Sequence, residues 1–121
     1  MLKPKRSKMS PPPEGCPLED CLGFLGGAWT TKILWYLRAE PRRFGDLKRD
    51  LGTISAKVLT TRLRELEERG IITRSVMPTS PPTVEYALTS FGVKFQPVLD
   101  AIVEVGSELL KRSPASRNSI N

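Results

Sequence analysis

Histidine is absent from this 121-residue chain, and cysteine occurs only as Cys16 and Cys21. Two cysteines without histidine are too few for the usual structural zinc site, and they cannot build a disulfide framework. The lack of histidine also removes the most common general base of acid–base and nucleophilic chemistry. The sequence therefore predicts no metal site, no cofactor and no enzymatic activity.

Long apolar runs are missing as well. No run approaches the length that spans a bilayer, and the basic N-terminus leads into Pro11, Pro12 and Pro13 where a secretory signal would have an apolar core. We therefore expect a cytoplasmic, nucleoid-associated protein without a membrane partner. An excess of 19 Lys and Arg over 13 Asp and Glu gives a net charge of +6, which suits an anionic partner such as nucleic acid.

The composition divides the chain into three parts. Residues 1–15 combine four cations with a proline run and almost no apolar side chains, which predicts a disordered arm. Residues 16–112 carry the apolar periodicity of one small domain, and residues 113–121 are polar, which predicts a flexible tail. The basic arm could contact DNA or could simply keep the protein soluble, and the sequence leaves both readings open.

The most informative stretch is ISAKVLTTRLRELEERG, residues 54–70, which has the period of an amphipathic helix. Its apolar stripe consists of Leu59, Leu63 and Leu66. Ser55 stands at the N-cap, and Gly70 stands at the left-handed position after the last turn. The acid-free first half of its polar side comprises Ser55, Lys57, Thr60, Thr61, Arg62 and Arg64. The second half is acidic, as expected of a helix that meets DNA by its N-terminal end, although an ordinary solvated face would look similar.

Three shorter helices are predicted before this stretch, over residues 17–25, 29–38 and 44–51. Gly52 and Thr53 form a tight turn from the third helix into the next, which makes a helix-turn-helix. The predicted strands are residues 71–76 and 84–88, joined by the turn-forming residues 77–83. A helix-turn-helix followed by a hairpin is a winged helix. The predicted fold is therefore mainly α with a small β-hairpin (α+β), a winged helix-turn-helix.

A last helix is predicted from Ser90 or Phe91 to Lys111, with Thr89 as its cap. Its apolar residues, which cover more than one face, are Phe95, Val98, Leu99, Ile102, Val103, Leu109 and Leu110. A single winged helix has little core left to bury so wide a surface. The sequence therefore predicts a partner for this helix, most simply a second copy of the chain.

These segments, in this order and at this spacing, resemble the HxlR-type family of bacterial and archaeal winged-helix transcriptional regulators. The matching segments are CPLE (residues 16–19), GGAW (26–29), PRRFGDL (41–47), ISAKVLTTRLRELEERGII (54–72), PPTVEYALT (81–89) and PVLDAI (97–102). The resemblance implies a sequence-specific regulator that acts as a homodimer. Its first and last helices would form the dimer interface, and its two winged helices would bind a palindromic operator in double-stranded DNA.

The resemblance also implies which residues meet DNA. The residues that would face the major groove are Ser55, Lys57, Thr60, Thr61 and Arg64. Arg43 and the hairpin between Arg74 and Glu85 would flank the phosphates. In that hairpin Thr83 stands where the family often has a cation, so this wing has one cation fewer.

The chemistry of base edges refines these roles. Arg64 and Lys57 are the best candidates for contacts to guanine O6 and N7. The competing structural role for Arg64 is a surface ion pair with Glu67 or Glu68. Sequence-independent attraction to phosphates is predicted from Arg42, Arg43, Lys48, Arg49 and Arg74.

In some members of the family the cysteine of the Cys-Pro pair senses oxidants or electrophiles, and here that position is Cys16. A thiol just before a helix can have its thiolate stabilised by the helix dipole, although a structural cysteine fits the position equally well. Cys21 lies too far along the same helix to pair easily with Cys16, so oxidation would more readily link two subunits. No effector is indicated by the sequence.

The alternative function is a winged helix that serves as a protein-interaction or assembly module. The broad apolar last helix and two missing cations favour it. Thr83 stands where the family often has a wing cation, and Ala28 stands where members usually have a basic residue before the tryptophan. This alternative predicts no salt-dependent DNA binding, whereas a DNA-binding regulator loses affinity steeply as salt rises.

Overall fold

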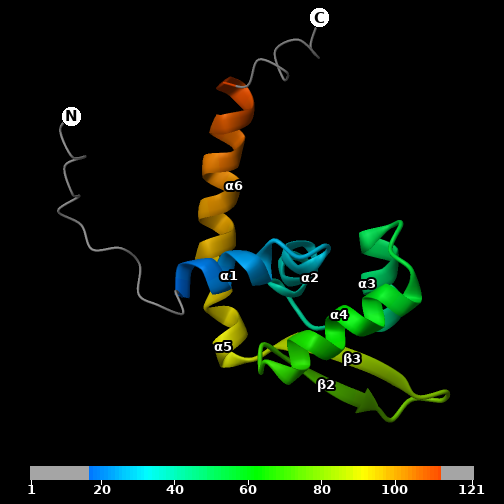
Figure 1. Ribbon diagram of the computed structural model, residues 1–121. Helices are drawn as coiled ribbons and strands as arrows, with labels where there is room; N and C mark the ends of the chain where they lie inside the picture. Colours follow the sequence, from blue (N-terminus) through cyan, green and yellow to red (C-terminus); the bar gives the residue numbers. More distant parts are fainter. Residues whose placement is uncertain (1–16, 113–121) are drawn as a thin grey trace, which may run out of the picture.

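The computed structural model describes residues 17–112. In chain order its elements are α1 (Pro17–Leu25), α2 (Thr30–Leu37), β1 (Arg42–Arg43), α3 (Phe44–Leu51), α4 (Ala56–Glu68), β2 (Ile72–Met77), β3 (Thr83–Leu88), α5 (Ser90–Val93) and α6 (Phe95–Arg112) (Figure 1). The arm predicted over residues 1–15, Cys16 and the tail predicted over residues 113–121 lie outside the described residues. Within residues 17–112 the predicted winged helix-turn-helix is confirmed.

The core lies where α2, α3 and α4 meet. Ile33 and Leu34 of α2, Leu47 of α3, and Leu59 and Leu63 of α4 are almost fully buried. These are the apolar positions that helical periodicity assigns to the inner faces of their helices. Burying aliphatic side chains of this size is the main force that holds α4 against the other two helices.

The sheet has three antiparallel strands in the order β1-β3-β2. The hairpin pairs Ile72 with Leu88 at its base and Met77 with Thr83 near its tip. The two-residue strand β1 adds to the other edge of β3 and was not predicted. Its residues are both arginine, which has no strong strand preference, and its partner strand comes much later in the chain.

Both ends of α4 are capped as predicted. The Ser55 hydroxyl oxygen accepts a hydrogen bond of 3.1 Å from the backbone N–H of Val58. At the other end Gly70 has a φ of 75°, in the left-handed region. Its N–H donates to the carbonyl oxygen of Glu67, and the next N–H donates to that of Leu66, both at 3.0 Å. This pair of bonds is the Schellman motif that ends many helices.

The predicted last helix is two helices, α5 and α6, separated at Lys94. Thr89 caps the first of them as predicted, since its hydroxyl accepts a bond of 2.9 Å from the N–H of Gly92. The break follows from Pro97, which has no N–H to donate to the carbonyl of the residue four positions earlier. The prediction of one continuous helix was therefore wrong.

The polar contacts that hold α6 to other described elements lie in its first turns. Asp100 forms an ion pair of 2.6 Å with Arg38 of α2, and Gln96 donates a bond of 3.1 Å to the Arg38 carbonyl oxygen. Leu99 is the last residue of the helix that is buried. The remaining turns extend away from the other elements (Figure 1).

A large apolar surface is consequently exposed on α1 and α6. The exposed apolar side chains are Leu18 and Leu22 of α1 and Val98, Ile102, Val103, Val105, Leu109 and Leu110 of α6. Exposed apolar side chains gathered on two helices are typical of surfaces that bind a partner. No helix in the described part of the chain is long and apolar enough to cross a membrane.

Candidate nucleic-acid interface

The outward side of α4 carries Lys57, Thr60 and Arg64. Their spacing of three and four residues puts them on one helical face, and all three are exposed. The described part of the chain offers no ion-pair partner to Lys57 or Arg64, so the expected alternative of an Arg64 pair with Glu67 or Glu68 does not form. The first turn of α4 has no acidic residue. This face therefore presents two cations to an anionic partner.

Two further hydroxyls predicted to meet DNA are engaged within the helix. The Thr61 hydroxyl donates a bond of 3.0 Å to the carbonyl oxygen of Lys57, so only its lone pairs remain for a partner. The Ser55 hydroxyl accepts the capping bond, so its proton remains for a phosphate or a base. Toward a bound partner, Thr61 can therefore act as a hydrogen-bond acceptor and Ser55 as a donor.

A hollow between α4 and the sheet brings the helix and the hairpin together. It is lined by Thr60, Arg64 and Glu67 of α4, by Arg74 of β2 and by Tyr86 of β3, among others. Figure 1 shows α4 beside the β2–β3 hairpin that supplies these strand residues. The two guanidinium groups outnumber the one carboxylate, so the hollow favours an anion such as a backbone phosphate.

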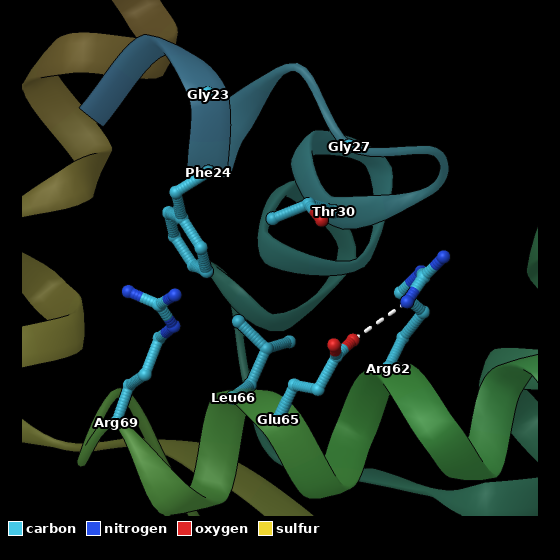
Figure 2. A pocket seen from close by; sticks show the side chains of 8 residues that line it. All are labelled: Gly23, Phe24, Gly27, Thr30, Arg62, Glu65, Leu66 and Arg69. Atoms are coloured by element: carbon cyan, nitrogen blue, oxygen red, sulfur yellow. Dashed lines mark hydrogen bonds and ion pairs between the residues drawn. The ribbon is translucent and has the colours of Figure 1, made fainter. Parts of the chain in front are cut away.

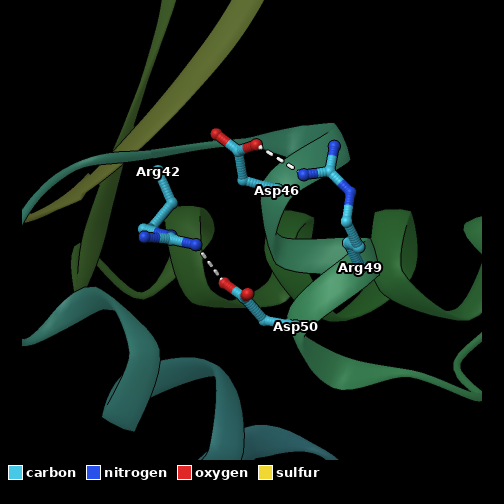
Figure 3. Close-up of polar contacts among 4 residues, drawn as sticks. All are labelled: Arg42, Asp46, Arg49 and Asp50. Atoms are coloured by element: carbon cyan, nitrogen blue, oxygen red, sulfur yellow. Dashed lines mark hydrogen bonds and ion pairs between the residues drawn. The ribbon is translucent and has the colours of Figure 1, made fainter.

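Arg42 occupies a different environment from the one predicted. Its guanidinium forms an ion pair with Asp50 of α3 and is only partly exposed, with 28% of the side chain accessible (Figure 3). Its buried Nε has no hydrogen-bond partner among the described residues. Arg49, in contrast, is highly exposed and pairs with Asp46 at 3.3 Å. Arg42 therefore joins β1 to α3, whereas Arg49 stays accessible to a phosphate.

The hairpin forms a wing whose tip, residues 78–82, has no charged residue. The tip is held by the Thr79 hydroxyl, which donates a bond of 2.8 Å to the carbonyl oxygen of Pro81 and lies 3.2 Å from the Thr83 hydroxyl. Arg74 is the only cation in the two strands and the tip. The wing can thus offer one guanidinium near its base and hydroxyl groups beyond it.

Arg62 is not on the outward face, although the sequence places it in the acid-free first half of the polar side of this helix. Its side chain points toward the loop between α1 and α2, donates a bond of 3.2 Å to the Ala28 carbonyl oxygen, and pairs with Glu65 at 2.6 Å (Figure 2). Arg69, the C-cap of α4, lies on the same side, and its guanidinium carbon is 5.0 Å from the ring centre of Phe24 in α1. The spacing of three and four residues between Arg62, Glu65 and Arg69 was the signal that could have revealed this second face.

The family assignment rests on comparison with known sequences and structures. The profile of the HxlR-like helix-turn-helix family matches residues 24–114. The chain belongs to this family. It is 43% identical over 97 residues to an uncharacterized HTH-type transcriptional regulator of Synechocystis, across 80% of this chain and 72% of that protein. It is therefore a DNA-binding transcriptional regulator.

Two solved structures show the same fold. A protein described as a MarR-family transcriptional regulator from Porphyromonas gingivalis is 36% identical, with a TM-score of 0.75 over 84% of this chain and 98% of that one. The oxidised form of the redox regulator HypR is also 36% identical, with a TM-score of 0.71 over 77% of this chain and 96% of that one. Both therefore share the winged helix with this member of the HxlR family.

The predicted site residues of this HxlR-family protein lie in several places. Thr60, Arg64 and Arg74 line the hollow between α4 and the wing, and Lys57 is exposed on the same face of α4 as Thr60 and Arg64. Arg43 is exposed where β1 meets α3, and Lys48 is partly exposed on α3. Cys16 lies outside the described residues, while Cys21 is a free, half-buried thiol in α1.

Proposed function

We propose that this HxlR-family regulator binds a palindromic operator as a homodimer, with α4 of each copy in the major groove. The observation that carries the proposal is the outward face of α4. There Lys57, Thr60 and Arg64 are exposed, no carboxylate occupies the first turn, and neither cation is paired with a described residue. A helix that enters the groove by its N-terminal half needs such a face, since phosphates repel carboxylates.

In this arrangement the cations have different tasks. Arg64 and Lys57 contact base edges, with guanine as the preferred base because its O6 and N7 accept two bonds from one guanidinium. Arg43, Lys48, Arg49 and Arg74 attract phosphates independently of sequence. Ser55, Thr60, Thr61 and Thr83 add hydroxyl groups to bases or phosphates. Arg42 acts indirectly, since its pair with Asp50 holds β1 and α3 together.

The homodimer forms through α1 and α6. Their exposed leucines, isoleucine and valines make up eight of the thirteen exposed large apolar side chains in the described part of the chain. Pairing two copies would bury this surface and set two α4 helices about 34 Å apart, one turn of DNA. Sedimentation equilibrium of the whole chain should therefore give twice the monomer mass.

The experiment that tests DNA binding is selection of bound duplexes from a random pool, followed by a salt titration on the selected site. We expect an inverted repeat, and log K should fall linearly with log salt as phosphate counterions are released. A protein that selects no sequence and shows no salt dependence would contradict the proposal. It would favour the protein-interaction module instead.

We also propose that oxidation of Cys16 lowers operator affinity. Support comes from the 36% identity to HypR, whose structure is described as that of a redox regulator in its oxidised form. Diamide should weaken operator binding by the wild type and by Cys21→Ser, but not by Cys16→Ser. An equal response from all three proteins would exclude Cys16 as the sensor.

A further inference from the structure

Gly106 lies at the centre of the apolar face of α6. At 3.6 residues per turn its nearest neighbours on the helix surface are the residues three and four positions away. These neighbours are Ile102, Val103, Leu109 and Leu110. All four are large apolar side chains, with exposed fractions of 48%, 48%, 65% and 63%. The glycine is therefore a gap ringed by apolar side chains that the other described residues cover only in part.

No contact with another described residue requires a glycine at this position. Apart from proline, glycine is the least favourable residue inside a helix. A Cβ built at Gly106 meets no atom within 4 Å, so the fold of one copy leaves room for a larger residue. Gly92 is the opposite case, because a Cβ there would lie 2.1 Å from the Ile71 carbonyl oxygen. The packing of the described residues requires a glycine at position 92 but not at position 106.

We propose that Gly106 is the point at which the α6 helices of two copies cross. This inference rests on the proposed homodimer and specifies how its subunits meet. A missing side chain lets two helix backbones approach closely, so that the apolar side chains around it interlock across the crossing. Packing across the interface then offsets the helix stability that glycine costs the single chain.

The partner assigned to this face is a second copy of this chain, related by a twofold axis. A residue on the twofold axis of a dimer meets its own counterpart, so a large side chain there would collide with itself. Glycine avoids this collision. The charged residues of this part of α6, which include Asp100, Glu104, Glu108 and Lys111, point away from Gly106 by helical geometry and would remain in water. The face is thus apolar at its centre and charged only outside the contact.

The test compares the same new side chain at two adjacent positions in the full-length protein. Gly106→Leu should raise the dimer dissociation constant by about tenfold or more, because it overfills the crossing. Ser107→Leu adds the same side chain about 100° around the helix and should change the constant by less than about threefold. Sedimentation equilibrium measures both constants. Circular dichroism should show undiminished helix content in both variants, since leucine is the better helix former.

A cross-linking experiment tests the geometry with a smaller side chain. In a Cys16→Ser, Cys21→Ser background, Gly106→Cys should form an intermolecular disulfide rapidly under mild oxidation. Ser107→Cys should form it slowly, because a disulfide needs Cα atoms about 4.4–6.8 Å apart. Non-reducing electrophoresis measures the linked fraction over time.

The outcomes distinguish a failure of the proposed crossing at Gly106 from a failure of the proposed homodimer. A wild-type protein that sediments as a monomer would end the homodimer proposal and the crossing with it. A wild-type dimer that Leu109→Glu dissociates, but that Gly106→Leu leaves intact or strengthens, would keep the dimer and overturn the crossing. Equal cross-linking at positions 106 and 107 would overturn it as well.

Discussion

Arg62 in the middle of α4 donates a hydrogen bond to the carbonyl oxygen of Ala28, 34 residues earlier in the chain. The same guanidinium pairs with Glu65, one turn further along the helix. The helix that we propose to lie in the major groove is thereby fastened to the loop that follows α1. Since α1 belongs to the proposed dimer interface, in the proposed dimer this contact would help to set the position of α4 relative to the partner subunit.

Replacing Arg62 by alanine should lower the free energy of unfolding. The loss should be about 1 kcal/mol, because one charge-assisted hydrogen bond and one partly exposed ion pair disappear. Urea denaturation followed by circular dichroism measures it. Arg64→Ala is the matched control, since Arg64 is exposed and has no ion pair with a described residue, and it should leave stability unchanged. Equal losses in the two variants would show that the Ala28 contact contributes nothing.

Arg64→Ala should instead weaken operator binding. The expected loss is about 1–3 kcal/mol on the selected site, with a smaller effect on unrelated DNA, if the guanidinium reads a base. Binding isotherms on both duplexes at one salt concentration measure the difference. Arg69→Ala removes the same charge from the side of α4 that faces Phe24, and it should have little effect on specificity. An unchanged isotherm for Arg64→Ala would remove this residue from base recognition.

Arg74→Ala should weaken binding to all DNA sequences to a similar extent. As the one cation of the wing, Arg74 is placed to contact a phosphate, so its loss should reduce the slope of log K against log salt by about 1. Salt titrations of the variant on selected and random duplexes give this slope. A loss confined to the selected operator would instead assign Arg74 to base recognition.

Gly92→Ala should destabilise the fold strongly. The new Cβ would lie 2.1 Å from the Ile71 carbonyl oxygen, in backbone that already receives bonds from Thr89. We expect a loss of about 1–3 kcal/mol or more, since backbone has to move. Gly23→Ala in α1 is the control, because its Cβ meets nothing within 4 Å and alanine favours the helix. Thermal unfolding that ranks the two variants in the opposite order would contradict this packing.

The sequence allowed much of the fold to be predicted because the relevant signals are local. Ser55, Gly70 and Thr89 mark helix ends through bonds that span only a few residues, and all three caps are confirmed. The β2–β3 hairpin was likewise predicted from neighbouring strands and turn residues. The two-residue strand β1 was missed because its pairing with β3 is long-range, and the break at Lys94 was missed because Pro97 was not weighed against the apolar pattern.

The candidate site likewise has features that local sequence determines and features that depend on long-range packing. Helical periodicity by itself determined that Lys57, Thr60 and Arg64 share one exposed face of α4, because side chains three and four residues apart must neighbour each other. Only the tertiary structure decided that Arg42 turns to Asp50 and Arg62 to Ala28, since each of these arginines selects its partner from whatever the packed fold places within its reach. An exposed arginine and one that fastens two elements carry the same charge in the sequence, and packing is what distinguishes them.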